Sequence, residues 1–262
     1  MDKNAYFLKI KKKLQNLGVK KGSTIIVCSD ILKFLILFKK KKINFNSDDF
    51  IDLLIDIVGE RGTIVFYSFN WNFFQGKIFN YRESKSFSGA LSNTALKRND
   101  FKRSKSPVYS LLVYGKYQKY ICNMKHSDCF SLNSPFGFLL KKRAKCLFFD
   151  LDYKNSAFPF FHVAEQKAKS YYRFFKFFSG KVIQGKKVKK LKIKMFVRKN
   201  NYKVTTIYSN STDTYLKKNN ALIKNKFLSI NISLLDTKKL YEVTVKQLKL
   251  ENKLFLRKIT NI

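Results

Sequence analysis

A histidine and a glutamate three residues apart are the side chains of this sequence best suited to proton transfer. His162 and Glu165 lie in FFHVAEQKAKSYYRFFKFFSG, residues 160–180, and the chain of 262 residues has only two histidines. Residues three apart are neighbours on a helix. A neutral imidazole accepts a proton near neutral pH, and a carboxylate beside it can fix its tautomer. The pair is therefore either a catalytic base with its orienting carboxylate or a polar turn of an ordinary helix.

Other polar side chains follow segments that are predicted to be buried strands. Loops at the carboxyl ends of strands gather ligands in layered α/β folds. Those loops contain Cys28-Ser29-Asp30, Ser68-Phe69-Asn70-Trp71, Ser104-Lys105-Ser106-Pro107 and Asp150-Leu151-Asp152. No phosphate-binding loop, GxGxxG or GxSxG motif occurs, which argues against nucleotide hydrolysis, dinucleotide redox chemistry and standard hydrolase chemistry. A histidine, nearby carboxylates and a basic environment remain, and this set suits proton transfer next to an anionic substrate.

Two further interpretations concern the aspartates Asp150 and Asp152 and the second histidine. Asp150 and Asp152 follow a predicted strand, and they either orient His162 or cap a turn. The second histidine, His126, lies in the polar stretch NMKHSDCF and is expected to be an exposed bystander.

The four cysteines predict reduced thiols and no metal site. Cys28, Cys122, Cys129 and Cys146 form no CxxC pair and have no neighbouring histidine at metal-ligand spacing. Cys28 follows a buried strand with no histidine near it in sequence, so it is not a convincing acyl-enzyme nucleophile. The N-terminal segment lacks an apolar signal core, and ILKFLILF is too short and too broken by a lysine to span a bilayer. We therefore expect a soluble, cytoplasmic protein.

The first third of the chain alternates helices and strands with short connections. We expect a helix at 4–17, a strand at 24–28, a helix that begins after Ser29-Asp30, a helix at 48–58 capped by Ser47 or Asp48, and a strand at 63–69. This order is typical of a layered α/β fold.

The rest of the chain extends the same pattern. A helix is expected near Ala90, strands at SLLVYG and AKCLFFDLD, and a helix over 160–178 whose aromatic run from Tyr171 to Phe178 is mostly core. After Gly180 the alternation in KVKKLKIKMFVR predicts a half-exposed strand, and a helix-strand tail completes the chain. No repeat or linker divides the sequence, so residues 1–262 are expected to form a single domain.

The charge balance is strongly basic. The chain has 54 Lys+Arg against 17 Asp+Glu, a formal net charge of +37. Such a charge attracts nucleic acid, anionic membranes or phosphorylated substrates. However, the lysines are spread along a chain rich in Asn, Phe, Ile and Tyr, as expected of a coding sequence drifted toward A and T. No nucleic-acid-binding motif is visible, so no specific nucleic-acid partner is expected. A basic nucleic-acid-binding protein remains the alternative from another class.

Five segments, taken in order, resemble one enzyme family. They are LGVKKGSTIIVCSD, VGERGTIVFYSFNW, FSGALSNTALKR…FKRSKSPVYSLLVYG, NSPFGFLL and FFHVAEQKA…YYRFFKFFSG. Their order and spacing over about residues 15–180 resemble the aminoglycoside 3-N-acetyltransferase family. The loop FNWNFFQGKIFNY is similar to the branch of that family found in surface-polysaccharide gene clusters.

The resemblance implies an acetyl-CoA-dependent N-acetyltransferase. Its fold would be a three-layer α/β/α sandwich around a central mixed sheet, completed by a strand-rich, basic part at 181–262. The acceptor would be an amino sugar, nucleotide-linked, acetylated directly in a ternary complex, and a homodimer is a possible assembly. The implied catalytic residues are His162 and Glu165, the coenzyme residues Cys28, Ser29, Asp30, Arg103 and Ser104, and the acceptor residues Asn70, Trp71, Ser106 and Asp152.

Two positions depart from the family pattern. The HS of the opening motif is Cys28-Ser29, and Ser106 stands where the family's RSxHP motif has histidine. A hydroxyl without a partner cannot act as a base at neutral pH, although it can form a hydrogen bond to a sugar. A member of the family that has lost catalysis is therefore a second alternative.

Overall fold

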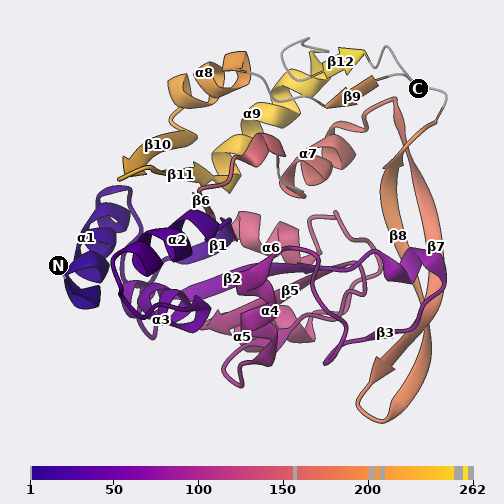
Figure 1. Ribbon diagram of the computed structural model, residues 1–262. Helices are drawn as coiled ribbons and strands as arrows, with labels where there is room; N and C mark the ends of the chain where they lie inside the picture. Colours follow the sequence, from indigo (N-terminus) through magenta and orange to yellow (C-terminus); the bar gives the residue numbers. More distant parts are fainter. Residues whose placement is uncertain (1, 156–157, 201–203, 207–209, 251–255, 259–262) are drawn as a thin grey trace.

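A seven-stranded mixed sheet runs through the middle of the computed structural model (Figure 1). The structure describes residues 2–155, 158–200, 204–206, 210–250 and 256–258. In the order β10-β11-β6-β1-β2-β5-β4, the strands are Leu222–Phe227, Ile230–Asp236, Lys145–Phe149, Thr24–Ser29, Thr63–Phe69, Tyr109–Gly115 and Lys102–Arg103. Strands β6, β1 and β2 are parallel, and the outer strands are antiparallel to their neighbours. The predicted central mixed sheet is confirmed.

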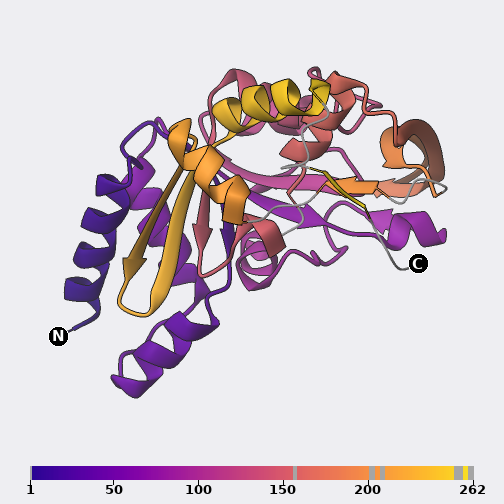
Figure 2. The ribbon, with the colours of Figure 1, turned by 90° about the horizontal axis from the view of Figure 1, so that it is seen from above.

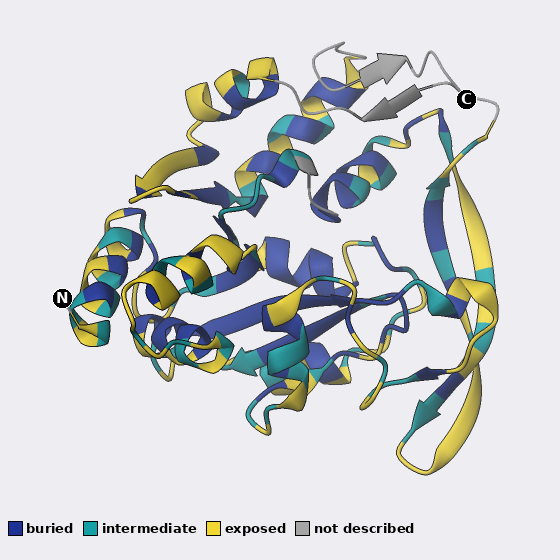
Figure 3. Ribbon diagram, viewed as in Figure 1, coloured by how far each residue is buried: buried dark blue, intermediate teal, exposed yellow. Residues whose placement is uncertain are grey.

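Both faces of this sheet are buried, because apolar residues continue along the central strands. On β1, Ile25 and Val27 contact one core, whereas Ile26 and Cys28 contact the other. Figure 2 shows helices on both sides of the sheet, and Figure 3 shows the central strands in the colour of buried residues. The three-layer α/β/α architecture is therefore confirmed.

Each face has its own set of helices. The first face is covered by α1 (Lys3–Asn16), α2 (Leu32–Lys40), α3 (Ser47–Val58) and α4 (Ala90–Lys97). The second face is covered by α5 (Gln118–Asn123), α6 (Pro135–Lys141), α7 (Phe160–Ala168) and α9 (Thr237–Lys249). Short elements complete the chain: η1 (Asn72–Gln75), β3 (Phe79–Asn80), η2 (Tyr153–Asn155), β9 (Val204–Thr206), α8 (Asn210–Lys218) and β12 (Leu256–Lys258). Among the described residues no helix is long and apolar enough to cross a membrane.

Two helix starts differ from the prediction. Helix α3 is capped by Asn46, whose side chain accepts from the backbone N–H of Asp49 while the Asp49 carboxylate accepts from the backbone N–H of Asn46. This reciprocal pair of hydrogen bonds is a capping box, and it satisfies two backbone amide groups at once. Ser47 or Asp48 could not form one, because the residue three positions later is Phe50 or Ile51, and neither side chain can accept a hydrogen bond. Helix α2 begins at Leu32, and the Asp30 carboxylate accepts from the Leu32 amide.

The predicted helix over 160–178 is wrong in its second half. Helix α7 ends at Ala168, and Lys169 follows with φ 54°. Residues Arg173–Gln184 instead form β7, which pairs with β8 (Lys187–Arg198) in a long hairpin at one flank of the molecule (Figure 1). Aromatic residues at nearly every position of this segment fit both helical and strand spacing, and pairing with a distant strand decides between them.

The hairpin also changes where its aromatic residues lie. Phe174, Phe175 and Phe177 are exposed, so the aromatic run is not mostly core. Strand β8 lies where KVKKLKIKMFVR predicts a strand. Two strands from the C-terminal third, β10 and β11, join the central sheet beside β6.

Candidate active site

The predicted pair of catalytic side chains is in direct contact on α7. The Nδ1 atom of His162 lies 2.7 Å from Oε2 of Glu165. The imidazole is 32% exposed, whereas the carboxylate is fully buried. Because Nδ1 contacts the carboxylate, Nε2 is the ring nitrogen left for a substrate. The geometry is that of a base whose tautomer is fixed by its neighbour.

Two residues that the sequence did not single out hold Glu165 in place. The Tyr172 hydroxyl donates to Oε1 at 2.9 Å, and Nε of Arg173 lies 2.9 Å from Oε2. Arg173 also donates from Nη1 to the carbonyl oxygen of Phe196 on β8 at 3.0 Å. A buried carboxylate is stable only with such partners. The misassigned segment after α7 therefore supplies part of the site, and the arginine in its sequence was the available signal.

A row of ring contacts joins Trp71 to His162. The ring centroids of Trp71 and Tyr109 are 5.3 Å apart, those of Tyr109 and Phe130 are 4.9 Å apart, and those of Phe130 and His162 are 5.0 Å apart. The row connects the end of β2, the start of β5, the loop before α6 and helix α7. Burial raises the pKa of Tyr109. The structure thus brings the predicted acceptor residue Trp71 to the wall that reaches the histidine, and it adds Tyr109 and Phe130.

Ser106 lies beside this wall but is almost completely buried, at 2% exposure. Within the part of the chain that the structure describes, its Oγ has no hydrogen-bond partner. It lies next to the thiol of Cys129, whose pKa is raised by burial to about 12. Contact between Ser106 and an acceptor stays a prediction.

Two buried polar atoms that lack a partner in the described chain belong to α7 and the residues directly after it. Oε1 of Gln166 and Oγ of Ser170 have none among the described residues, and both belong to the segment of His162. Buried polar atoms usually find a partner, either in the protein or in water or ligand. These atoms mark the surroundings of the pair as a place where a substrate or ordered water can be bound.

Three residues that were predicted to bind coenzyme or acceptor form hydrogen bonds inside the protein. They are Arg103, Asn70 and Ser104. Arg103 donates from Nε to Oγ of Ser110 at 2.9 Å and from Nη2 to the carbonyl oxygen of Ser68 at 2.8 Å. It also donates to the carbonyl oxygen of Ser84, and its guanidinium lies 4.6 Å from the centre of the Phe79 ring. Burial lowers the pKa of Arg103 to about 10. This side chain clamps the loop between β2 and α4 onto the sheet.

Asn70 and Ser104 have similar roles. Asn70 donates to the carbonyl oxygen of Lys85 at 2.9 Å and accepts from the amide of Asn72 at 3.0 Å. Ser104 is fully buried and accepts from the amide of Leu111 at 2.8 Å. These polar atoms form hydrogen bonds inside the protein, and contact of Asn70 or Ser104 with a ligand stays a prediction.

The residues at the end of β1 lie in two different environments, the core and the carboxyl edge of the sheet. Cys28 is buried, with its sulfur 3.7 Å from that of Cys146 in the core. Ser29 lies at the carboxyl edge of the sheet, close to Gly89, where an added Cβ would lie 3.8 Å from the Ser29 carbonyl oxygen. Gly89 has φ 111° and caps α4 without a side chain, whereas the first amide of α2, that of Leu32, donates to the Asp30 carboxylate. Helix N-termini with free amides attract phosphate groups.

The two aspartates after β6 lie in a different place from the histidine. Asp150 pairs with Lys33 at 3.0 Å, and Asp152 accepts from the amide of Lys154 at 2.9 Å. Both line a recess of about 720 Å³ with Lys224. The carboxylate that orients His162 is therefore Glu165, and the hypothesis that these aspartates do so is wrong.

His126 is not an exposed bystander. It is half-buried, and burial lowers its pKa.

Comparisons with known proteins agree with this architecture. A family model described as aminoglycoside 3-N-acetyltransferase matches residues 39–249, which extends beyond the resembling segments into the C-terminal third. AAC-IIIb in a binary complex with CoASH has a TM-score of 0.76 at 16% identity, covering 94% of this chain and 96% of that chain. AAC-VIa bound to sisomicin has a TM-score of 0.77 at 14% identity, covering 94% and 98%. The YokD protein from Bacillus subtilis has a TM-score of 0.70 at 21% identity, covering 92% and 97%.

These solved structures show a common fold, and no relative is found among curated protein sequences. The family model covers far more than half of the sequence, including the pair on α7, the loop after β2 and the hairpin. The chain belongs to the aminoglycoside 3-N-acetyltransferase family and is an N-acetyltransferase.

Proposed function

We propose that this protein transfers acetyl from acetyl-CoA to the amine of an amino sugar, with His162 as the base. The observation that carries the proposal is the 2.7 Å contact between a partly exposed imidazole and a fully buried carboxylate. The family supplies the reaction class, and a fold neighbour that binds CoASH supports the donor.

The residues of the pair divide the proton transfer between them. An amine is protonated at neutral pH, and it must first release one proton to solvent so that its nitrogen has a free electron pair. As this nitrogen bonds to the thioester carbonyl carbon it loses a second proton, which His162 accepts at Nε2 while its Nδ1–H donates to Glu165. As the carbon–sulfur bond breaks, the proton passes on to the departing thiolate. A positioned base of this kind contributes about 100- to 10,000-fold to the rate.

The coenzyme fits best at the carboxyl edge around Ser29. The start of α4, which has no side-chain cap, lies there with Gly89 close to Ser29, and the field of this helix end favours a diphosphate. A side chain at position 89 would need a strained backbone, because φ is 111°. We therefore retain Ser29 and Asp30 as coenzyme-binding residues.

The acceptor is proposed to be an anionic amino sugar, such as a nucleotide-linked one. Aminoglycosides are polyamines with several positive charges, and a chain of net charge +37 repels them. The carboxylates nearest the histidine are already engaged, since Glu165 pairs with Arg173 and Asp128 pairs with Lys194 at 3.4 Å. The rings of Trp71 and Tyr109 can stack against a sugar or base.

A comparison of acceptors tests this proposal. Purified protein with acetyl-CoA should acetylate a nucleoside-diphosphate amino sugar at low salt and should leave sisomicin almost unchanged. Preferential acetylation of sisomicin would contradict the acceptor class.

Acetylation by the Ser106→His variant, compared with the native chain, distinguishes an active enzyme from a family member that has lost catalysis. If the native chain binds coenzyme A and turns over no amino sugar, while the histidine variant does, then catalysis has been lost and the proposal fails.

A further inference from the structure

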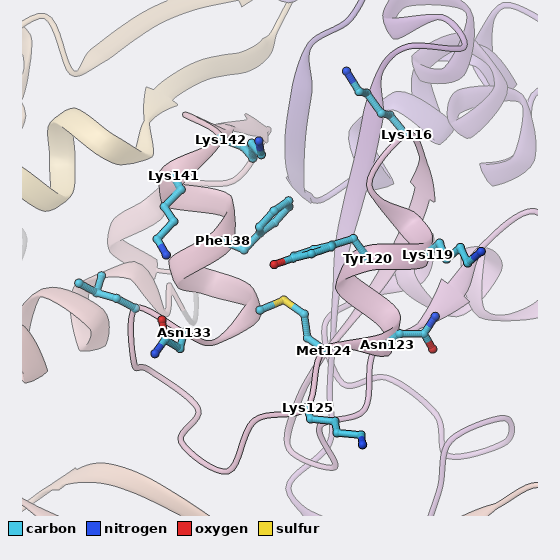
Figure 4. Close-up of a pocket in the computed structure, with 11 residues that line it drawn as sticks. Lys116, Lys119, Tyr120, Asn123, Met124, Lys125, Asn133, Phe138, Lys141 and Lys142 are labelled. Atoms are coloured by element: carbon cyan, nitrogen blue, oxygen red, sulfur yellow. The ribbon is translucent and has the colours of Figure 1, made fainter.

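A groove between α5 and α6 has a size and a lining that suit a second binding site (Figure 4). Its volume is about 920 Å³, within the usual range of small-molecule sites. The lining residues are Lys116, Lys119, Tyr120, Asn123, Met124, Lys125, Leu132, Asn133, Phe138, Lys141 and Lys142. Five of them are lysines, and none carries a carboxylate.

The lysines come from both walls of the groove. Lys141 and Lys142 lie on the α6 side, and Lys116 and Lys119 lie on the α5 side (Figure 4). In the described part of the chain, the ion pairs involve other lysines, such as Lys3 and Lys154, and none of these four. Figure 4 shows Tyr120 pointing into the gap, whereas Lys116 and Lys119 point away from it, so the lysines surround the groove. Their positive charges still attract an anion that binds there.

Two recesses along the β7–β8 hairpin are also lined by basic residues without a carboxylate, and they are smaller, at about 700 and 410 Å³. Two other recesses of the described chain carry mixed charge. The one beside Lys33 includes Asp150 and Asp152, and the one beside Lys21 includes Asp56 and Glu60. Their lysines have carboxylates close by, so an anion gains less there.

The floor of the groove is aromatic. Tyr120 is 57% exposed, yet its ring lies 4.5 Å from the ring of Phe138 at an angle of 31°. Nζ of Lys142 lies 5.6 Å from the centre of the Phe138 ring. Figure 4 shows both rings pointing into the space between the helices. Exposed rings beside lysines are the means by which proteins stack bases while binding their phosphates.

The groove is separate from the site of His162. The pair on α7 forms hydrogen bonds and ion pairs with Tyr172 and Arg173, and neither of these residues lines the groove. The lysine-rich end follows Gly115, which pairs with Thr63 at the start of β2, whereas Trp71 follows the other end of that strand. The lysine-rich end of the groove therefore lies toward the opposite end of β2 from Trp71, although the other end of the groove, at Leu132, is two residues from Phe130 of the ring row.

We propose that this groove binds a nucleotide, with the base on Tyr120 and the phosphate chain among Lys116, Lys119, Lys141 and Lys142. The volume of about 920 Å³ favours one small ligand over a polymer. An adenine nucleotide has two possible sources, a free nucleotide or the nucleotide part of coenzyme A. The separation from the histidine site favours the free nucleotide.

Titration calorimetry on the full chain tests the proposal with ADP, adenosine and tripolyphosphate. ADP should bind more tightly than adenosine or tripolyphosphate, and saturating coenzyme A should not displace it. Lys141→Glu with Lys142→Glu should weaken ADP and tripolyphosphate at least about tenfold, since charge-assisted contacts are lost. Tyr120→Ala should weaken ADP at least about fivefold and leave tripolyphosphate unchanged, because only stacking is lost.

The matched control is Lys39→Glu with Lys40→Glu at the end of α2, which removes the same charge elsewhere and should leave ADP binding within about twofold. Thermal unfolding checks that each variant is folded.

Three results would overturn the proposal. One is ADP affinity that is equal in the groove and control variants. Another is displacement of ADP by coenzyme A together with a raised KM for acetyl-CoA in the groove variants. The third is a single-stranded RNA that binds more tightly than ADP and loses affinity in the same variants.

Discussion

At the scale of single residues, Glu165 is where the polar contacts of the candidate site converge. It binds His162, Tyr172 and Arg173 and is inaccessible to solvent. Glu165→Gln keeps the volume but removes the charge, so the imidazolium loses its counter-ion and the guanidinium its partner. We expect kcat to fall about 10- to 100-fold with the KM for acetyl-CoA nearly unchanged. Steady-state kinetics measure this effect, and an unchanged kcat would show that the carboxylate is merely structural.

The cysteines belong to the same scale. All four are buried, and burial raises the pKa of Cys122 and Cys129 to about 12. A thiol whose pKa is raised stays protonated until the pH approaches that value, so it is a poor nucleophile at neutral pH. Iodoacetamide at pH 8 should therefore modify the folded protein slowly and leave its acetyltransferase activity intact. Rapid inactivation by one equivalent would point instead to a cysteine nucleophile.

At the scale of elements, the sequence predicts the parts that local patterns determine. Strand β2 lies at 63–69 as expected, because seven apolar or small residues between two turns fit only a buried strand. The end of α7 could not be predicted, since the aromatic run after it fits either period and the partner strand is distant in sequence. For the same reason the pairing of Arg173 with Glu165 could not be predicted, because it depends on the end of α7 and the start of β7.

Site residues divide in a similar way. The contact between His162 and Glu165 could be predicted, because residues three apart on a helix are neighbours. The internal hydrogen bonds of Arg103 and Asn70 could not, because polar residue type does not reveal whether a side chain binds a ligand or its own backbone. Tyr109 and Phe130 carry no sequence signal that separates them from core aromatics.

The clamp made by Arg103 leads to a prediction about the loop between β2 and α4. Arg103→Ala leaves the carbonyl oxygens of Ser68 and Ser84 and the hydroxyl of Ser110 without this donor. We expect the free energy of unfolding to fall by about 2–4 kcal/mol, since several buried acceptors lose their partner. Urea denaturation measures it. Lys105→Ala, an exposed neighbour, is the control and should change stability by less than about 0.5 kcal/mol. Equal effects of the two variants would contradict the clamp.

At the scale of the whole molecule, the net charge of +37 acts on every ligand. Nucleic acid should bind through this charge alone, because the lysines are dispersed. Affinity for DNA or RNA should fall steeply as salt rises and should not depend on sequence. Fluorescence anisotropy at several salt concentrations measures both properties. A sequence-specific complex that survives physiological salt would favour the nucleic-acid-binding alternative.

The same charge sets the conditions for the test of the central claim, which is that His162 is the base of an N-acetyltransferase. The most direct measurement is single-turnover acetylation of a nucleoside-diphosphate amino sugar at low salt, comparing the native chain with His162→Ala. We predict a loss of at least about 100-fold in the rate of acetyl transfer, with the affinity for coenzyme A within about twofold of the native value. Near-native transfer by His162→Ala, with the coenzyme bound, would contradict the account.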